Sequence, residues 1–151
     1  MIKSKLNKNG LFCGTIFGNR NLIEFGLATL SMQEKYKYKM HHMILPGIET
    51  KTLGLILQSL NFKDSSVMNF KKKLFFSSIK EMIDFIRILG GSNCLVQKRK
   101  TALSKTFFKD VEKEMLFLQT DTQIPSNYFE DSEIPKKIQC TFDINIFFCF
   151  N

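Results

Sequence analysis

With 151 residues and a mass of 17.6 kDa, the chain has the length of one ordinary domain. Its 44% hydrophobic residues, which include 16 Phe, exclude a disordered chain and supply the side chains for a packed core. The formal net charge of +8 indicates a polyanionic partner, because Lys and Arg that meet phosphates release condensed counterions.

The positive charge is concentrated in the first hundred residues, which contain 17 Lys and Arg against six Asp and Glu. Residues 101–151 contain five against eight. We therefore expect the basic surface to come from residues 1–100. No apolar run approaches the roughly 20 residues that a membrane span needs, so a membrane is not an expected partner.

The first half of the chain predicts one helix among three strands. Alternation in LFCGTIFG (residues 11–18) predicts a strand, and apolar residues at helical spacing predict a helix over 20–36. In YKYKMHHMILP (residues 36–46), Lys alternates with Tyr and Met, which predicts a second strand. The run TLGLILQS (residues 52–59) predicts a third strand.

The next segment predicts a hairpin followed by a capped helix. Residues 61–76 pass from the polar NFKDSS to the basic and aromatic FKKKLFF, as in a long hairpin or protruding loop. Ser78 and Glu81 form a capping box that predicts the start of a helix. Gly90 is expected to end that helix, and residues 94–96 predict a fourth strand.

The predicted order is β-α-β-β-α-β, which favours an α+β fold: a two-layer, ferredoxin-like domain over residues 1–100, with a long hairpin loop. After it, apolar residues at helical spacing predict a helix over 107–118, and a polar linker leads to an alternating apolar strand over 140–150. We interpret residues 101–151 as a C-terminal extension that binds protein. Its deletion is expected to leave RNA affinity largely intact.

Four short patterns in the first hundred residues resemble the universal small-subunit ribosomal protein ten (NusE) family. They are Leu45-Pro46, Leu57-x-Ser59, Ser66-x-x-x-Phe70, and KEMIDFIRILGGSNCLVQKRK with Lys80, Asp84 and Arg87. The sequence departs from the family at His41-His42, which replaces Gly-Pro, and at Leu60-Asn61, which replaces Pro-His. Residues 101–151 have no counterpart in the short bacterial members.

This resemblance implies a structural constituent of the small ribosomal subunit that binds ribosomal RNA in the subunit head, beside neighbouring head proteins, and supports translation. Lys outnumbers Arg by 19 to 3, and Phe, Ile and Asn abound, which is typical of an AT-rich coding genome such as an organelle's. The expected location is therefore an organellar ribosome, in the mitochondrion.

The predicted RNA-binding residues lie mostly around the hairpin. In FKKKLFF, three adjacent Lys can contact phosphates while Phe70 and Phe75 contact exposed bases; the alternative is a solvated charge run. The full predicted set is Lys35, Lys37, Lys39, His41, His42, Lys51, Lys63, Lys71, Lys72, Lys73, Lys98, Arg99 and Lys100.

No motif indicates catalysis, a cofactor, a metal or a small-molecule substrate. His41 and His42 are the only histidines and have no acid or Cys near them in sequence. The four cysteines (Cys13, Cys94, Cys140 and Cys149) are scattered, which predicts buried, reduced residues. Two other classes stay open: a protein–protein adaptor, and a free-standing RNA-binding regulator with a ferredoxin-like sheet.

Overall fold

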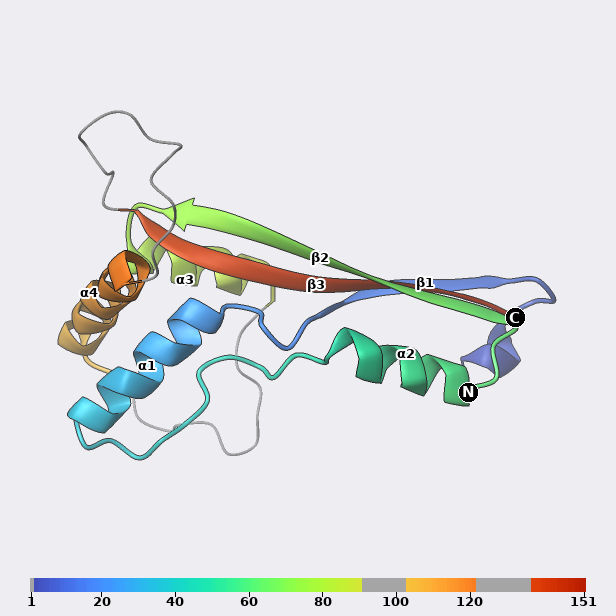
Figure 1. Ribbon diagram of the computed structural model, residues 1–151, viewed down its shortest axis with the longest axis horizontal. Helices are drawn as coiled ribbons and strands as arrows, with labels where there is room; N and C mark the ends of the chain where they lie inside the picture. Colours follow the sequence, from blue (N-terminus) through green and yellow to red (C-terminus); the bar gives the residue numbers. More distant parts are fainter. Residues whose placement is uncertain (1, 91–102, 122–136) are drawn as a thin grey trace. The chain divides into compact units, whose positions relative to one another are not determined.

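The computed structural model describes residues 2–90, 103–121 and 137–151, which form an α+β protein. Its elements, in chain order, are the 3-10 helix η1 (Lys3–Lys5), β1 (Leu11–Phe17), α1 (Ile23–Lys35), α2 (Thr50–Ser59), β2 (Asp64–Phe76), α3 (Ile79–Ile88), α4 (Lys105–Asp121) and β3 (Ile138–Phe150) (Figure 1). None of these helices combines the length and the apolar character that crossing a membrane requires.

The three strands form an antiparallel sheet in the order β1-β3-β2, so the last strand of the chain lies in the middle. β1 pairs with β3 from Leu11 opposite Phe150 to Phe17 opposite Ile144. β3 is rich in Ile and Phe, and residues of this kind suit a strand with neighbours on both sides. The strand expected in the C-terminal extension is therefore present, and it is the central strand of the sheet.

Local signals correctly predicted β1, α1, α3 and α4. At the start of α3, the Ser78 hydroxyl accepts a hydrogen bond from the Glu81 backbone N–H at 3.2 Å. The Glu81 carboxylate accepts from the Ser77 N–H at 2.8 Å, one residue before the position that a capping box specifies. Gly90 has a positive φ of 74°, as expected after the end of a helix.

The predicted strand over residues 36–46 is wrong, because the described chain forms no strand there. Lys37 has a φ of 52°, which interrupts an extended backbone. Beyond it, the buried side chain of Gln33 binds the backbone of His41, accepting from its N–H at 2.9 Å and donating to its carbonyl at 3.1 Å. A side chain thus satisfies backbone groups that a strand partner was expected to satisfy.

The predicted strand over residues 52–59 is also wrong, because this segment belongs to α2. The run TLGLILQS has apolar residues at both strand and helix spacing, and short apolar runs do not distinguish the two periods. The helix forms because it places Leu53 and Leu57, four residues apart, on one face that is buried in the core. The predicted strand at 94–96 lies outside the described residues.

The chain divides into two compact units, each built from several segments. Unit 1 comprises residues 1–21, 46–72 and 141–151, and unit 2 comprises residues 22–45 and 73–140. Both units thus draw on segments before and after residue 100, where the sequence predicted a domain boundary.

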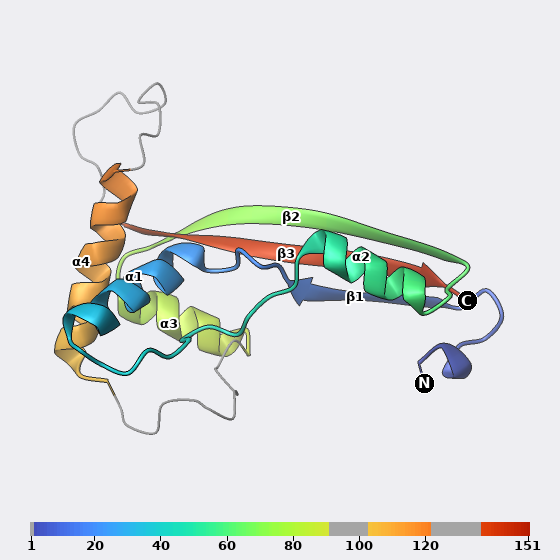
Figure 2. The same cartoon turned by 60° about the horizontal axis from the view of Figure 1, so that its bottom comes forward.

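Each unit has its own core. In unit 1, Leu53 and Leu57 of α2 pack with Cys149 of β3, and Phe12 and Phe147 join them. In unit 2, α1 and α3 contact α4 (Figures 1 and 2). α4 contributes Phe107, Val111 and Met115, and α1 and α3 contribute Ala28, Met32 and Met82, all buried.

The cysteines only partly match the expectation of burial. Cys140 and Cys149 are buried, whereas Cys13 is exposed on β1, and Cys94 lies outside the described residues. The Cys140 sulfur lies 3.2 Å from the sulfur of Met82, and burial raises the pKa of this thiol to about 12. Cys140 therefore stays protonated and unreactive at neutral pH.

Candidate nucleic-acid interface

The basic and aromatic run predicted from the sequence lies on β2, at one edge of the sheet. Because β2 is one continuous strand from Asp64 to Phe76, the long hairpin or protruding loop predicted over residues 61–76 is wrong. Lys71, Lys72 and Lys73 are all exposed, and within the described part of the chain none of them has a carboxylate within ion-pair distance. Phe70 and Phe75 are 52% and 60% exposed. Free ammonium groups beside exposed rings suit phosphates and bases.

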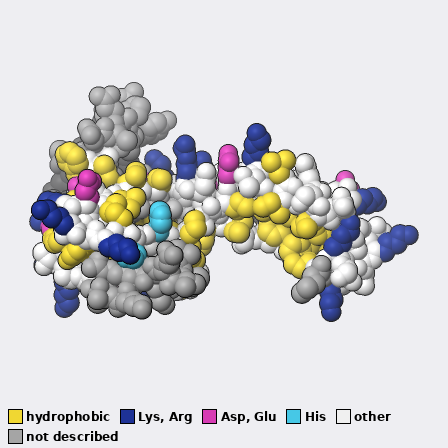
Figure 3. Space-filling model, turned by 90° about the horizontal axis from the view of Figure 1, so that it is seen from below, with side chains coloured by type: hydrophobic (Ala, Val, Ile, Leu, Met, Phe, Trp, Pro, Cys, Tyr) yellow, Lys and Arg dark blue, Asp and Glu magenta, His cyan; other side chains and the backbone are white. Residues whose placement is uncertain are grey.

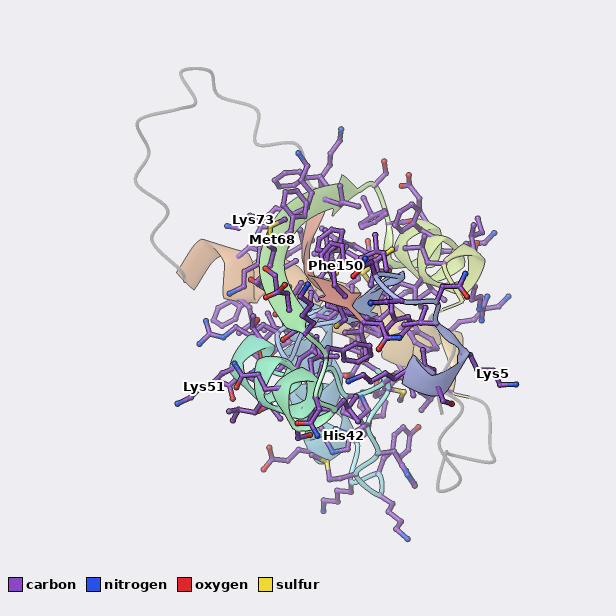
Figure 4. The ribbon with its side chains drawn as sticks, turned by 90° about the vertical axis from the view of Figure 1, so that its right-hand side faces the viewer. Lys5, His42, Lys51, Met68, Lys73 and Phe150 are labelled. Atoms are coloured by element: carbon purple, nitrogen blue, oxygen red, sulfur yellow. The ribbon has the colours of Figure 1, made fainter. Side chains whose placement is uncertain are left out.

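The two faces of β2 in unit 1 have different surroundings. Val67 packs against the core of α2, and the Asn69 amide binds side chains of β3. Because successive side chains of a strand point to opposite faces, Met68, Phe70 and Lys72 lie on the other face. Met68 and Phe70 are both more than half exposed there (Met68 is labelled in Figure 4).

A buried carboxylate, Asp143 of β3, holds three segments of unit 1 together. It is 2% exposed and accepts hydrogen bonds from the Asn69 amide at 2.6 Å and from the Arg20 backbone N–H at 3.0 Å. The Asp143 backbone N–H donates to the Asn21 side chain at 3.3 Å. Asp143 therefore fixes β2 and the end of β1 to the central strand.

Asn145, fully buried and two residues further along β3, continues this network toward α2. Its side-chain oxygen accepts from the Thr50 hydroxyl at 2.7 Å and from the Asn69 amide at 3.0 Å, and its amide donates to the Ile48 carbonyl at 2.8 Å. These hydrogen bonds fix the first turn of α2 and the adjoining Lys51. Figure 4 shows Lys51 projecting away from this helix.

Sequence reasoning missed the polar network. Its one signal was the pair Asp143-x-Asn145 on alternate positions of a mostly apolar strand. Gly18 is part of the same arrangement, because a Cβ at this position would lie 2.4 Å from the carboxylate of Asp143. The network is structural: it positions the basic strand and helix and presents no reactive group to solvent.

Sequence reasoning also missed the lysines of the N-terminal segment. Lys3 donates a hydrogen bond to the Asn61 carbonyl, and its ammonium group lies 5.7 Å from the centre of the Phe62 ring. Lys5 and Lys8 are exposed, and Figure 4 shows Lys5 projecting away from the segment. The interactions of Lys3 place these charges next to the C-terminal end of α2.

Unit 1 is the more basic of the two units for its size. It holds eight Lys and Arg against three Asp and Glu, and one of those three acids, Asp143, is buried. On the face of the chain seen in Figure 3, dark blue Lys and Arg side chains outnumber magenta Asp and Glu. The excess of positive charge makes unit 1 the better candidate for contact with a polyanion.

The structure distributes the predicted RNA-binding residues over both units. Unit 1 contains Lys51, Lys63, Lys71 and Lys72, and unit 2 contains Lys35, Lys37, Lys39, His41, His42 and Lys73. Lys98, Arg99 and Lys100 lie outside the described residues. Among the described ones, His41 is half-buried, while every predicted lysine is exposed.

The histidines belong to no metal centre among the residues that the structure describes, which contain no group of three potential ligands from His, Cys, Asp and Glu. Next to Lys35, the last residue of α1, the Tyr36 hydroxyl donates to Asp110 of α4 at 2.6 Å. This bond raises the pKa of Tyr36 and lowers the pKa of Asp110. The pair links two helices of unit 2.

No family model matches the sequence, and no curated protein matches it either.

Proposed function

We propose that this protein is a non-enzymatic RNA-binding protein that acts through its charged surface. The observation that carries the proposal is the edge of β2 in unit 1, where Lys71 and Lys72 lack ion pairs among the described residues and follow the exposed ring of Phe70. Lys51 and Lys63 belong to the same basic unit. Such a surface binds phosphates through ammonium groups and leaves rings available for bases.

We further propose that the RNA is ribosomal and that the protein is a structural constituent of the small subunit, in the subunit head and beside other head proteins. The resemblance to the ribosomal protein ten family supports this. A ferredoxin-like arrangement and a mitochondrial location belong to the same proposal.

Sedimentation in native cells tests the ribosomal proposal. The tagged full-length protein is expected to co-sediment with the small subunit in a sucrose gradient, and to leave that fraction after RNase treatment. A known protein of the large subunit serves as the control, since it must not follow the tagged chain into the small-subunit fraction. Migration as a small complex that RNase does not change would favour the protein–protein adaptor.

Replacing Lys71, Lys72 and Lys73 by Ala is expected to weaken RNA binding and to flatten its dependence on salt. The slope of log affinity against log salt concentration should fall by about one unit for each phosphate that the variant no longer binds. The measurement is fluorescence anisotropy with a ribosomal RNA fragment over a series of KCl concentrations.

The control for this prediction removes the same charge elsewhere: Lys80, Lys105 and Lys109 are exposed and lie on helices of unit 2. Their replacement by Ala is expected to leave the slope nearly unchanged. Equal slopes for the two triple variants would show that β2 is not the phosphate-binding surface.

A further inference from the structure

The sheet of unit 1 has one covered face. Phe12 of β1 and Asn145 and Cys149 of β3 point toward α2, where Phe12 and Cys149 join its core and Asn145 binds Thr50. The register between β1 and β3 confirms this assignment, because Phe12 lies directly opposite Cys149. Residues directly opposite each other in an antiparallel pair share a face.

The opposite face is formed by the alternate residues. The register places Leu11 opposite Phe150, Cys13 opposite Phe148, Thr15 opposite Ile146, and Phe17 opposite Ile144. β2 adds Met68, Phe70 and Lys72 by the same alternation. Leu11, Met68, Phe70 and Phe150 are each 44% exposed or more, so this part of the sheet surface is open (Phe150 is labelled in Figure 4).

Aromatic rings lie toward both ends of this open face. Phe148 and Phe150 are near the end of β3 that pairs with the start of β1. The bonds of Asn69 to Asp143 and Asn145 place Phe70 beside the other end, near Phe17 and Ile144. Between the ends, the surface is formed by smaller and aliphatic side chains such as Thr15, Ile146 and Met68. Rings spaced along an open sheet offer stacking partners for successive unpaired bases.

The charges around this face favour a polyanion. Lys72 lies on the same side of β2, and the backbone N–H of Lys63 donates to the Phe150 carbonyl at 2.9 Å, so Lys63 adjoins the aromatic end. β2 contributes one acidic residue to the open face, Asp64 at the start of the strand. A second copy of the chain would oppose two units that each hold eight basic residues against three acids, which disfavours self-association.

We propose that this open face, formed by the alternate residues of β1, β2 and β3, binds unpaired RNA bases by stacking. It would thereby give the protein a preference for single-stranded over double-stranded RNA. The inference rests on the proposed RNA-binding function and names the form of RNA that this surface takes. Phe70 and Phe148 are the two rings that carry it, and Lys72 contacts the phosphates of the bound strand.

The test uses the purified full chain with two fluorescent probes: a short oligouridine and a fully paired RNA hairpin. Phe70→Leu and Phe148→Leu remove a ring and keep an apolar side chain. Each is expected to weaken oligouridine binding by roughly 5-fold or more, since the loss of one stacked base has about that effect. Hairpin affinity should change by less than about 2-fold, whereas Phe70→Tyr should retain oligouridine binding because it keeps the ring.

Leu55→Ala is the matched control, because Leu55 is 58% exposed on α2, away from the open face. Circular dichroism verifies that every variant is folded. If the wild-type chain bound neither probe, the proposed RNA-binding function would fail. If it bound RNA but the Leu variants bound oligouridine as tightly as the wild type, stacking on the open face would be refuted while RNA binding would stand. A protein would then be the better partner for the open face.

Discussion

A chain that ends at Lys137 is expected not to form its sheet. β3 is the central strand, so its removal leaves β1 and β2 without their common partner and removes Cys149 from the core of α2. Because a domain is usually stable by only about 5–15 kcal/mol, we expect the loss of a central strand to unfold unit 1. Far-ultraviolet circular dichroism should show loss of strand signal, and urea titration should show no cooperative transition from unit 1.

The same result is expected for a chain that lacks residues 101–151, whose RNA affinity the sequence led us to expect to be unaffected. The central place of β3 leads to the opposite expectation. A synthetic peptide of residues 137–151 added to the truncated chain should restore part of the strand signal, and a scrambled peptide of the same composition is its control. A truncated chain with an unchanged spectrum and cooperative unfolding would contradict the assigned sheet order.

Asp143→Ala is expected to destabilise the protein by about 2–4 kcal/mol. The substitution removes the charged acceptor of two hydrogen bonds, from the Asn69 amide and from the Arg20 backbone N–H. The free energy of unfolding should therefore fall, because this one carboxylate holds two other segments to the central strand. Urea denaturation followed by circular dichroism measures the effect.

Asp64→Ala provides the comparison, because Asp64 is an exposed carboxylate at the start of β2. Its replacement is expected to change the free energy of unfolding by less than about 0.5 kcal/mol, as is usual for surface positions. Similar losses of stability for the two variants would mean that the buried network around Asp143 has no special role in stability.

The sequence allowed the correct prediction of elements whose signals are local. The capping residues Ser78 and Glu81 marked the start of α3, and helical spacing of apolar residues marked α1 and α4. α2 was assigned to a strand because only its tertiary packing, through Leu53 and Leu57, distinguishes the two periods. The central place of β3 depends on pairing with β1, at the other end of the chain, and no local pattern reports such a partner.

The candidate site divides in the same way. Exposed lysines such as Lys71 and Lys72 were predictable from the local sequence, because a run of lysines beside aromatic residues is solvated whatever the rest of the chain does. The network of Asp143 and Asn145 was not predictable, since its partners come from segments far apart in sequence. The open sheet face was missed for a similar reason: its rings come from both β2 and β3, and only the register brings them together.

The pairing of Leu11 with Phe150 also determines when unit 1 can fold during synthesis of the protein. During translation, β1 leaves the ribosome well before its strand partner β3 has been made. Unit 1 can therefore close only after β3 has been synthesised, and long-range pairing of this kind is intrinsically slow. In the interval, the apolar side chains of β1 and the exposed edge of β2 are open to solvent, which makes the nascent chain a natural client for chaperones that shield unpaired strands.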